Sequence, residues 1–580
     1  MRDFWYNKLT MSDVFGFRIR VVSFFVLVLG LLFGVKLFWL QVIHGHEYSE
    51  QADRQYITPE GAQFDRGTIF FKKKNGELVS AASLLRGFTL AINPKILTDE
   101  QAVFEKIKSI IPTVDQETFL AQAAKKADTY EEVATRITED QAAQIKALKI
   151  PGVSLYRMSS RFSPSGTTAP HVIGFVSYKG NDLVGRYGVE RSYNDVLSRT
   201  QSRLYVNFFA EVFSHITNLS SDKNPVEGDV ITNLEPAVQN SLQNELELTR
   251  ERWKSDRTMG IVMDPKTGKI IAMASTPGFD INNYRSESSV SIFNDPLIES
   301  AFEMGSIMKP IILAIALDQG AVTAETRYMD YGSVKVGDRT IRNFDHKGRG
   351  NVNMQIVLNQ SLNTGMVYIM SQMERSKFRD QFINFGFGDK TGIDLPAEIG
   401  GITTNLKSNR EVEYANISFG QGIAATPIGM IRAMAALANG GKIIEPHIVD
   451  SIEYMDGSKK EIPTKEIRQV IKPETSAEIT RMMINVFDNY FDGAKKLEHY
   501  SIAGKTGTAQ IADRTTGGYY ADRNMHTFVG YFPAYNPEFI IFLLNEYPKE
   551  GARFSSQTLV DPFLNLTKFL INYYNIPPDR

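Results

Sequence analysis

The sequence predicts an α+β fold for the C-terminal part of the chain, residues 228–580. This part begins with two strand-like segments joined by a turn, continues through a long helical middle, and ends with more alternating strand-like segments. Together these segments predict a five-stranded antiparallel sheet with helices around it. The predicted strands are residues 258–264, 269–275, 501–511, 527–532 and 539–545.

An apolar stretch near the start of the chain, residues 21–43, has the length that a membrane-spanning helix requires, about 20 residues. Basic residues precede it in the tail 1–20, so the positive-inside rule predicts a cytoplasmic N-terminus and an exported remainder. A cleavable signal peptide is the rival interpretation. It fails on length, and no small-x-small cleavage site follows the apolar core before Lys36.

Residues 44–227 predict a mixed pedestal domain between the membrane segment and the α+β part. Residues 57–80 are strand-like with a Lys-rich turn, and Thr138 to Gln141 predicts a capping box that opens a helix through Leu148. No serine of this segment combines a helix start with a lysine or histidine at usable spacing. We therefore predict packing and protein contact, rather than catalysis, for the pedestal.

Composition excludes several classes of function. The chain has 580 residues, a net charge of -2 and 43% hydrophobic residues, which suits packed cores and disfavours nucleic acid as a partner. It has no cysteine, so disulfides and thiolate metal sites are excluded. The one close histidine pair, His44 and His46, borders the apolar stretch, where a polar pair is expected more than a metal site. No metal or organic cofactor is predicted.

The segment Ser306-Ile307-Met308-Lys309 predicts a catalytic site at a helix start, because Gly305 precedes it and an apolar run follows it. Residues three apart share a helical face, so the amine of Lys309 is predicted to reach the hydroxyl of Ser306. The positive helix end would stabilise an oxyanion. A lysine acts as a base only when it is neutral, which requires burial or a second cation nearby.

Each motif alone is weak. A second Ser-x-x-Lys, at Ser220, lies in a polar stretch with no apolar run behind it. Of the Lys-Thr-Gly triplets, those at Lys266 and Lys390 fit turns and loops, and only Lys505 follows a strand-like segment. Ser361-Leu362-Asn363 lies where a loop enters a predicted helix. The order Ser-x-x-Lys, Ser-x-Asn, Lys-Thr-Gly, each in suitable context, is the informative signal.

The three ordered motifs resemble those of penicillin-binding proteins and serine β-lactamases. Further segments are similar to class B penicillin-binding proteins, the membrane-anchored monofunctional transpeptidases. In the catalytic part these are residues 262–268, 419–423, 438–441 and 504–510. In the pedestal, which is similar to that family's non-catalytic dimerisation-like module, they are residues 65–69, 171–174 and 187–190.

The resemblance implies a role for each motif residue in a D,D-transpeptidase that cross-links peptidoglycan stem peptides. Ser306 would attack the D-alanyl-D-alanine amide, Lys309 would take its proton, and Ser361 would relay a proton to the leaving D-alanine. Asn363 would hold the substrate amide. Lys505, Thr506, Gly507 and Thr508 would bind the terminal carboxylate, with the amides of Ser306 and Thr508 as the oxyanion hole.

The chain departs from the family pattern at several positions, of which Met304 lies nearest the predicted site. A proline usually precedes the Gly-Ser pair there, so Met304 is expected to loosen this turn rather than alter the chemistry.

Three alternatives stay open. A hydrolase of the carboxypeptidase or β-lactamase type would share the acylation step, but the pedestal and the anchor argue against it. An elongation-type transpeptidase often carries Ser-x-Asp in the second motif, so Asn363 favours the division branch and a role in septal wall synthesis. A non-catalytic division scaffold is disfavoured because all three motifs are intact.

The expected location is the plasma membrane, with a single span and an extracytoplasmic catalytic domain. The resemblance implies stem peptides as substrates, β-lactams as inhibitors and a multispanning glycan polymerase of the SEDS type as a partner, along with other division proteins. The Gly30-x-x-x-Gly34 pair would allow a polymerase helix to approach closely.

Overall fold

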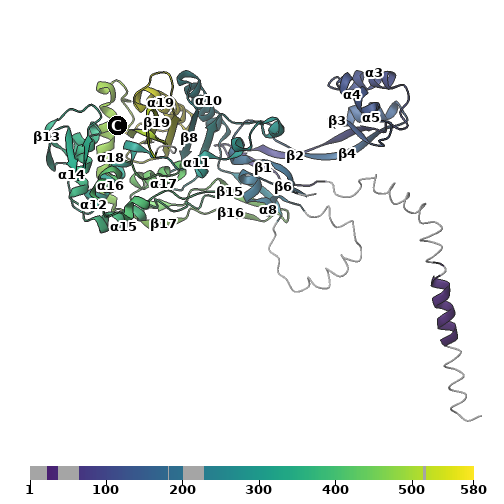
Figure 1. Ribbon diagram of the computed structural model, residues 1–580, viewed down its shortest axis with the longest axis horizontal. Helices are drawn as coiled ribbons and strands as arrows, with labels where there is room; N and C mark the ends of the chain where they lie inside the picture. The colour runs from purple at the N-terminus through teal and green to yellow at the C-terminus, as the bar shows by residue number, and fades with distance from the viewer. Residues whose placement is uncertain (1–22, 35, 37–63, 180–181, 200–226, 514–516) are drawn as a thin grey trace, which may run out of the picture. The chain divides into compact units, whose positions relative to one another are not determined.

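The computed structural model describes residues 23–34, 36, 64–179, 182–199, 227–513 and 517–580 (Figure 1). The predicted tail, residues 1–20, and the ends of the predicted span, residues 21–43, lie outside these ranges, and residues 23–34 are helical. Within the described ranges, no helix is both long and apolar enough to cross a bilayer. The predicted span therefore stays a prediction.

The chain forms two compact units, and each is described by itself. The described residues of the smaller unit are the helix 23–34, residue 36 and residues 88–158. The described residues of the larger unit are 64–87, 159–179, 182–199, 227–513 and 517–580. The predicted module boundary at 227/228 falls inside this larger unit, so the boundary describes an order along the chain rather than a separation between folded bodies.

In residues 88–158 three short helices pack on a small antiparallel pair. The C-terminal half of β2 (Leu78–Ile92) pairs with β3 (Glu131–Ile137), with Phe88 opposite Ile137. A core that includes Leu90, Ile107 and Phe119 lies beneath the helices. The helices are α3 (Glu100–Ile110), α4 (Gln116–Ala123) and α5 (Glu139–Ala147), and β4 (Val153–Phe162) leads back out of the unit.

The predicted capping box is confirmed at the start of α5. The Thr138 hydroxyl accepts from the Gln141 amide, and the Gln141 side chain accepts from the Thr138 amide. The predicted strand-like segment ending at residue 80 forms a hairpin of β1 (Ile69–Lys72) with β2, with Lys72 opposite Leu78. The part of the predicted segment before residue 64 lies outside the described residues.

A mixed sheet inside the larger unit joins strands that are far apart in the sequence. Strand β1 runs parallel to β7 (Gly228–Thr232), with Ile69 opposite Val230, and β7 is antiparallel to β15 (Val449–Tyr454), which pairs with β16 (Lys459–Glu461). The start of the pedestal and the start of the catalytic part thus share a sheet. Short elements complete the pedestal's share of this unit: α6 (Pro170–Ile173), β5 (Val176–Lys179), β6 (Asp182–Gly185), α7 (Gly188–Ser192) and α8 (Asn194–Leu197).

A buried ion-pair cluster ties α7 to β4 and to the residues just before β1. Glu190, fully buried, accepts from Arg66 Nε at 2.6 Å and from Arg161 Nε at 2.5 Å. Arg66 also donates to the Glu190 carbonyl at 2.8 Å, and Arg161 donates to the Gly67 carbonyl at 2.7 Å. Each of these hydrogen bonds joins segments more than twenty residues apart, so the cluster fixes their relative positions.

The predicted five-stranded antiparallel sheet is confirmed, with the order β18-β19-β20-β8-β9. The late strands β18 (Ala503–Asp513), β19 (Gly518–Phe532) and β20 (Phe539–Glu546) sit beside the early hairpin of β8 (Arg257–Met263) and β9 (Ile270–Thr276). Strand β20 pairs antiparallel with β8, so the late strands join the early hairpin although the whole helical middle separates them in the sequence. Strand β18 is left at an edge.

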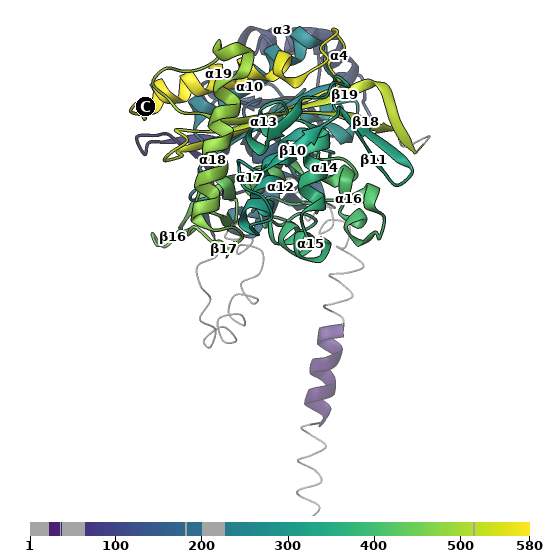
Figure 2. The same ribbon diagram turned by 90° about the vertical axis from the view of Figure 1, so that its left-hand side faces the viewer.

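Both faces of this sheet are covered by helices, which explains the long apolar runs of β8, β9 and β20. On one face, Val262, Phe528 and Ile541 pack with α10 (Pro236–Trp253) and α19 (Ser555–Tyr574), which lie above the sheet in Figure 1. On the other face, Ile261 and Phe542 belong to the core of the helical middle. Figure 2 shows α18 (Pro473–Asp488) beside α17 (Pro427–Ala438) and α12 (Lys309–Asp318) in this middle.

The rest of the middle consists of short elements around α12. The helices are α11 (Pro296–Glu299), α13 (Met354–Asn359), α14 (Asn363–Ser371), α15 (Arg375–Asn384) and α16 (Glu411–Ile417). Three small antiparallel pairs join β10 (Arg327–Asp330) to β13 (Gly350–Asn353), β11 (Ser333–Val336) to β12 (Arg339–Arg342), and β14 (Lys442–Ile444) to β17 (Glu466–Gln469).

Candidate active site

Ser306 lies on a single 3₁₀ turn, η5 (Gly305–Met308), and the α-helix α12 begins only at Lys309. The sequence predicted a helix start here, and the structure refines this to a tighter turn. Gly305 has φ of +60°, and a Cβ there would lie 2.8 Å from the Thr508 carbonyl oxygen. Its amide donates to Gly420 O at 3.2 Å. Only glycine fits this conformation and this approach.

Met304, the residue that departs from the family pattern, is 1% exposed. The Thr527 hydroxyl donates to its carbonyl oxygen at 3.0 Å, which ties the residue to the central strand β19. A Cβ on Gly507 would come within 2.7 Å of the same oxygen. The turn is thus braced by hydrogen bonds on both sides of Met304, a stiffening that does not need the ring of a proline.

Lys309 is 0% exposed and its ammonium faces the second motif. Nζ donates to the Ser361 carbonyl at 2.6 Å, to the Ser361 hydroxyl at 3.1 Å and to Asn363 Oδ1 at 2.9 Å. An ammonium would donate in all three contacts, whereas a neutral amine has two hydrogens and would accept the hydrogen of the Ser361 hydroxyl in the third. In the described structure none goes to Ser306, so the direct contact predicted from the Ser-x-x-Lys spacing stays a prediction.

Burial lowers the pKa of Lys309 well below its usual value, and the nearby charge of Lys505 lowers it further. Within the described ranges, neither lysine has a carboxylate partner at ion-pair distance; the partners of both ammonium groups are neutral oxygens. Desolvation without compensation favours the neutral amine. This meets the condition that a lysine base requires, since only an amine can accept a proton.

The second motif leads from α13 into α14. Ser361 has φ of +52°, a left-handed conformation that turns the chain back toward Lys309, and Asn363 is the first residue of α14. Asn363 uses both ends of its side chain: Oδ1 accepts from Lys309, and Nδ2 donates to the Arg342 carbonyl at 3.0 Å. The structure therefore brings Ser361 and Asn363 to the same amine.

The third motif lies on the edge strand β18. Lys505 is 1% exposed, donates to the Thr506 carbonyl at 2.9 Å, and has a pKa lowered to about 7 by burial. The hydroxyls of Thr506 and Tyr490 share a hydrogen bond of 3.2 Å, and the Tyr490 oxygen also accepts from the Thr506 amide at 3.0 Å. Thr508 Oγ1 accepts from the Ser555 amide at 3.2 Å, which joins the strand to the start of α19.

Gly507 makes the close contact between the strand and the nucleophile turn possible. A Cβ at this position would lie 2.3 Å from the Thr527 hydroxyl and 3.0 Å from the side chain of Ile307. No side chain larger than hydrogen fits between these two elements. Gly507 thus acts through its small size, a role different from contact with a ligand.

The three motifs meet around a cavity of about 370 Å³. Five predicted site residues line it, namely Ser306, Ser361, Asn363, Thr506 and Thr508, while Lys309, Gly507 and Lys505 are buried around it. The other lining residues had no role predicted from the sequence: Phe344, Phe419, Gln421, Phe554, Ser555 and Ser556. Phe419 and Gln421 belong to the segment 419–423, which resembles the family but was not predicted to be part of the site.

Two aromatic rings stand at one wall of this cavity. Phe344 and Phe554 pack edge to face, with ring centroids 5.7 Å apart and an angle of 80° between the planes. Phe344 comes from the loop between β12 and β13, and Phe554 precedes α19. Both rings are partly exposed, at 57% and 41%. No periodic pattern marks either residue in the sequence, so sequence reasoning had no signal to find them.

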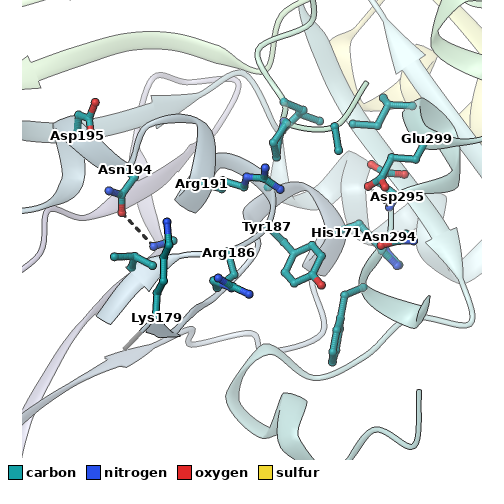
Figure 3. A pocket seen from close by; sticks show the side chains of 18 residues that line it. His171, Lys179, Arg186, Tyr187, Arg191, Asn194, Asp195, Asn294, Asp295 and Glu299 are labelled. Carbon is teal, nitrogen blue, oxygen red and sulfur yellow. Dashed lines mark hydrogen bonds between the residues drawn. The ribbon is translucent and has the colours of Figure 1, made fainter. Parts of the chain in front are cut away.

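A larger cavity of about 640 Å³ lies elsewhere in the larger unit, and no predicted site residue lines it (Figure 3). In this view Arg186 and Arg191 lie to the left of the carboxylates of Asp295 and Glu299. Burial raises the pKa of Asp295 to about 7. The cavity has acids and bases but no nucleophile beside a base, so its size does not make it the catalytic site.

The described residues contain no cluster of three or more histidines, aspartates or glutamates placed to hold a metal ion. The candidate site itself consists of hydroxyls, amides and two lysines. Such groups suit acyl transfer through a serine, because they provide a nucleophile, a base and donors for an oxyanion.

Comparison with known families decides the classification. Residues 258–565 match the family model described as the penicillin binding protein transpeptidase domain. The chain belongs to this family. Residues 64–232 match a second family model, the penicillin-binding protein dimerisation domain, which agrees with the predicted pedestal. The α+β transpeptidase fold and the preceding dimerisation module are thereby confirmed.

Curated relatives cover most of the chain. "Stage V sporulation protein D" of Bacillus subtilis is 29% identical over 557 residues, which is 93% of this chain and 82% of that protein. "Peptidoglycan D,D-transpeptidase MrdA" of Acinetobacter baumannii is 28% identical, over 91% of this chain and 84% of the relative. "Probable peptidoglycan D,D-transpeptidase PenA" of Neisseria gonorrhoeae is 24% identical over 96% of this chain and 94% of the relative.

Solved structures share the fold. Penicillin binding protein 2X from Streptococcus thermophilus superimposes with a TM-score of 0.72 at 22% identity, over 89% of this chain and 81% of that chain. Penicillin binding protein 3 of Mycobacterium tuberculosis, in complex with aztreonam, gives a TM-score of 0.67 at 21% identity, over 89% and 98%.

Proposed function

We propose that this protein is a serine-type peptidoglycan D,D-transpeptidase. The observation that carries the proposal is the buried Lys309, which bonds to the Ser361 hydroxyl and has no anionic partner within the described ranges, in a chain whose curated relatives include peptidoglycan D,D-transpeptidases. Its lowered pKa favours the neutral amine that a base requires. A buried base beside a serine on a tight turn is the arrangement that serine acyl transfer needs.

In the proposed first step, Ser306 Oγ attacks the carbonyl carbon between the two terminal D-alanines of a stem peptide. Its proton passes to the amine of Lys309, and the tetrahedral oxyanion accepts hydrogen bonds from the backbone amides of Ser306 and Thr508. The C–N bond then breaks. Ser361, which already shares a hydrogen bond with Lys309, relays the proton to the departing D-alanine amine.

In the second step, an amine from a neighbouring stem peptide attacks the acyl-enzyme ester. A new amide forms, the Ser306–acyl bond breaks, and the proton lost by the amine returns to Ser306 through Lys309. The net reaction exchanges one amide for another, so no oxidant, metal or nucleotide is needed. β-Lactams would acylate Ser306 in the same way, which supports their assignment as inhibitors, since the fold also occurs with bound aztreonam.

Lys505, Thr506 and Thr508 are proposed to bind the terminal carboxylate of the substrate, and Asn363 its amide. The hydroxyl of Thr506 lines the cavity, and Lys505 lies just beneath with a pKa of about 7. A carboxylate placed there would raise that pKa, because an opposite charge favours the ammonium. The substrate would thereby favour the charged form of Lys505, and the charge of Lys505 lowers the pKa of Lys309.

Ser306→Ala tests the proposed nucleophile. We expect loss of covalent labelling by a fluorescent penicillin, with a melting temperature close to the parent's, because a hydroxyl at a helix start contributes only about 1 kcal/mol. Mass spectrometry of the labelled parent protein should locate the adduct on Ser306. Labelling of the alanine variant at the parental level would refute the assignment.

A hydrolase would share this acylation, so product analysis is the discriminating assay. With a purified stem-peptide donor and an amine acceptor, a transpeptidase forms the cross-linked dimer, whereas a carboxypeptidase only releases D-alanine. We propose the division branch and a septal role, since the second motif is Ser361-x-Asn363. Relatives include a sporulation protein and MrdA, and depletion followed by cell-shape microscopy separates septal from elongation defects.

We propose a single membrane span at residues 21–43, an extracytoplasmic catalytic domain, and association with a SEDS-type glycan polymerase through the Gly30–Gly34 face. Replacing both glycines with leucine should obstruct helix approach, at about 1 to 2 kcal/mol of association. Co-purification with the polymerase should fall while penicillin labelling survives. Undiminished recovery of the polymerase with the double variant would exclude this face as the contact.

A further inference from the structure

A buried polar network lies directly behind the second motif. Asp330, Asn343 and Thr364 are only 2%, 1% and 5% exposed, and each comes from a different element: the end of β10, the loop after β12, and the first turn of α14. None of the three lines the catalytic cavity. Buried polar groups of this kind are costly to place, so a fully bonded network behind a catalytic helix calls for a reason.

The network has a defined polarity. Asn343 Nδ2 donates to both oxygens of Asp330, at 3.1 and 3.0 Å, and lies 3.2 Å from the Lys347 carbonyl. A carboxylate and a carbonyl only accept hydrogen bonds, so the NH₂ end of Asn343 has to face them. Its Oδ1 is thereby directed at Thr364, where the amide nitrogen lies at 3.2 Å and the hydroxyl at 2.9 Å.

This arrangement caps α14 from outside. Helix starts leave amides without partners, and α14 has no side-chain cap of its own at Leu362. Asn343, 21 residues upstream, supplies the missing acceptor for the Thr364 amide. Asp330 in turn accepts from the Thr364 hydroxyl at 2.8 Å and from the amides of Gly332 and Arg349, both at 3.0 Å.

The capped turn is the one that carries the catalytic groups. Asn363, next to Thr364, donates to the Arg342 carbonyl, which is next to Asn343, and accepts from Lys309. Phe344, on the other side of Asn343, stands in the cavity wall. The dipeptide 342–343 is therefore joined to the dipeptide 363–364 by two hydrogen bonds, one from Asn363 to residue 342 and one from Thr364 to residue 343.

We infer that Asp330 and Asn343 are positioning residues, which hold the Ser361–Asn363 turn at the distance from Lys309 that acylation requires. The inference rests on the proposed roles of Ser306, Lys309 and Ser361. Because displacement of a catalytic group by about 1 Å can cost roughly 100-fold in rate, loosening this turn should slow the chemical step. It should leave the initial binding of a carboxylate on β18 nearly intact, since that strand does not touch the network.

Asn343→Asp in the full-length protein is the main test. It places a second carboxylate against Asp330, so the network should open. In stopped-flow acylation by a chromogenic cephalosporin, we expect the saturating acylation rate constant to fall about 10- to 100-fold. The dissociation constant of the preceding complex should change less than about 3-fold.

Thr364→Val is a milder variant in case Asn343→Asp does not fold. It removes one buried hydroxyl and keeps the backbone amide, so the rate constant should fall about 5-fold, the equivalent of one hydrogen bond. Thr364→Ser keeps the hydroxyl and should stay near the parent. Thr258→Val controls for lost stability alone: its buried hydroxyl donates to the Leu246 carbonyl at 2.7 Å, away from the site, so its folded form should acylate at the parental rate.

The outcomes are distinguishable. If the parent protein is not acylated on Ser306, the proposed function itself fails. If the parent is acylated but the folded Asn343→Asp and Thr364→Val variants both react at the parental rate, the network is structural only and the inference is overturned. The inference is also overturned if the variants react more slowly only because the dissociation constant of the initial complex has risen. A reduced rate constant with a nearly unchanged dissociation constant, together with a near-parental rate in Thr364→Ser, supports the positioning role.

Discussion

Two regions of the larger unit bury positive charge, and they do so in opposite ways. In the pedestal segments, Arg66 and Arg161 are 1% and 5% exposed, and both donate to the carboxylate of Glu190. In the catalytic cavity, Lys309 and Lys505 are equally buried, yet in the described residues their partners are carbonyl, hydroxyl and amide oxygens. One region compensates its charge with an anion, and the other does not.

This difference separates structure from chemistry. A buried cation that has an anion beside it stays charged and holds chain segments together. A buried lysine without one loses its proton more readily, as the lowered pKa values of Lys309 and Lys505 indicate. The anion-free pair is thus suited to proton transfer, whereas the Arg66–Glu190–Arg161 cluster joins chain segments through its ion pairs.

Lys309→Met should produce the largest effect on activity. Removing the base should lower the acylation rate constant at saturating ligand by about 10³-fold or more. The free energy of unfolding should change by less than about 2 kcal/mol, because lost hydrogen bonds and the removal of a buried amine oppose each other. Stopped-flow acylation and urea denaturation measure the two quantities. Acylation at the parental rate would make Lys309 a structural residue.

Glu190→Gln should lower stability strongly and leave the acylation rate unchanged. Two buried guanidinium groups would lose their anion, at a cost of about 3 to 5 kcal/mol in the free energy of unfolding. The folded protein should still acylate at the parental rate, since the cluster does not line the catalytic cavity. Denaturation midpoints together with penicillin labelling below the transition provide the check. A variant as stable as the parent would show that the carboxylate is not needed.

The pH dependence of stability gives the smallest and finest comparison. Lys505 has a pKa of about 7 in the folded protein and 10.5 when exposed, so above pH 7 the unfolded chain binds more protons at this site. Stability should therefore rise with pH from about 7 towards 10.5, by at most about 1.4 kcal/mol per pH unit for this group. Lys505→Met should remove this part of the slope, measured by denaturation at pH 7.5 and 9.5. Equal slopes in both proteins would contradict the buried, anion-free environment.

Local patterns in the sequence predicted the central sheet well. Its strands β8 and β20 carry unbroken apolar runs. The capping box at Thr138 is another short-range signal that the structure confirms. The three motifs, in their order, also predicted which residues surround one cavity. Each of these signals depends on neighbours within a few residues of one another.

Long-range pairings were not predictable in the same way. Strand β1 pairs with β7, which lies more than 150 residues later in the chain, and no sequence pattern in either strand predicts this pairing. Asp330 and Asn343 belong to no recognisable sequence motif. Their hydrogen bonds to Thr364 form only because the fold brings the three residues together. The ammonium of Lys309 likewise bonds to Ser361 and Asn363 because of tertiary packing, whereas helical spacing had pointed to Ser306.

The sheet that joins β1, β7, β15 and β16 also sets the order of events during synthesis. The hairpin of β1 and β2 leaves the ribosome early, but β15 and β16 end only at Glu461. At translation rates of about 5 to 20 residues per second, the roughly 390 residues between Lys72 and Glu461 take about 20 to 80 s. Through this interval the nascent sheet keeps an unpaired edge, a site where other chains can add strands. This sheet, which begins with an early hairpin, is therefore completed only when most of the chain has been synthesised.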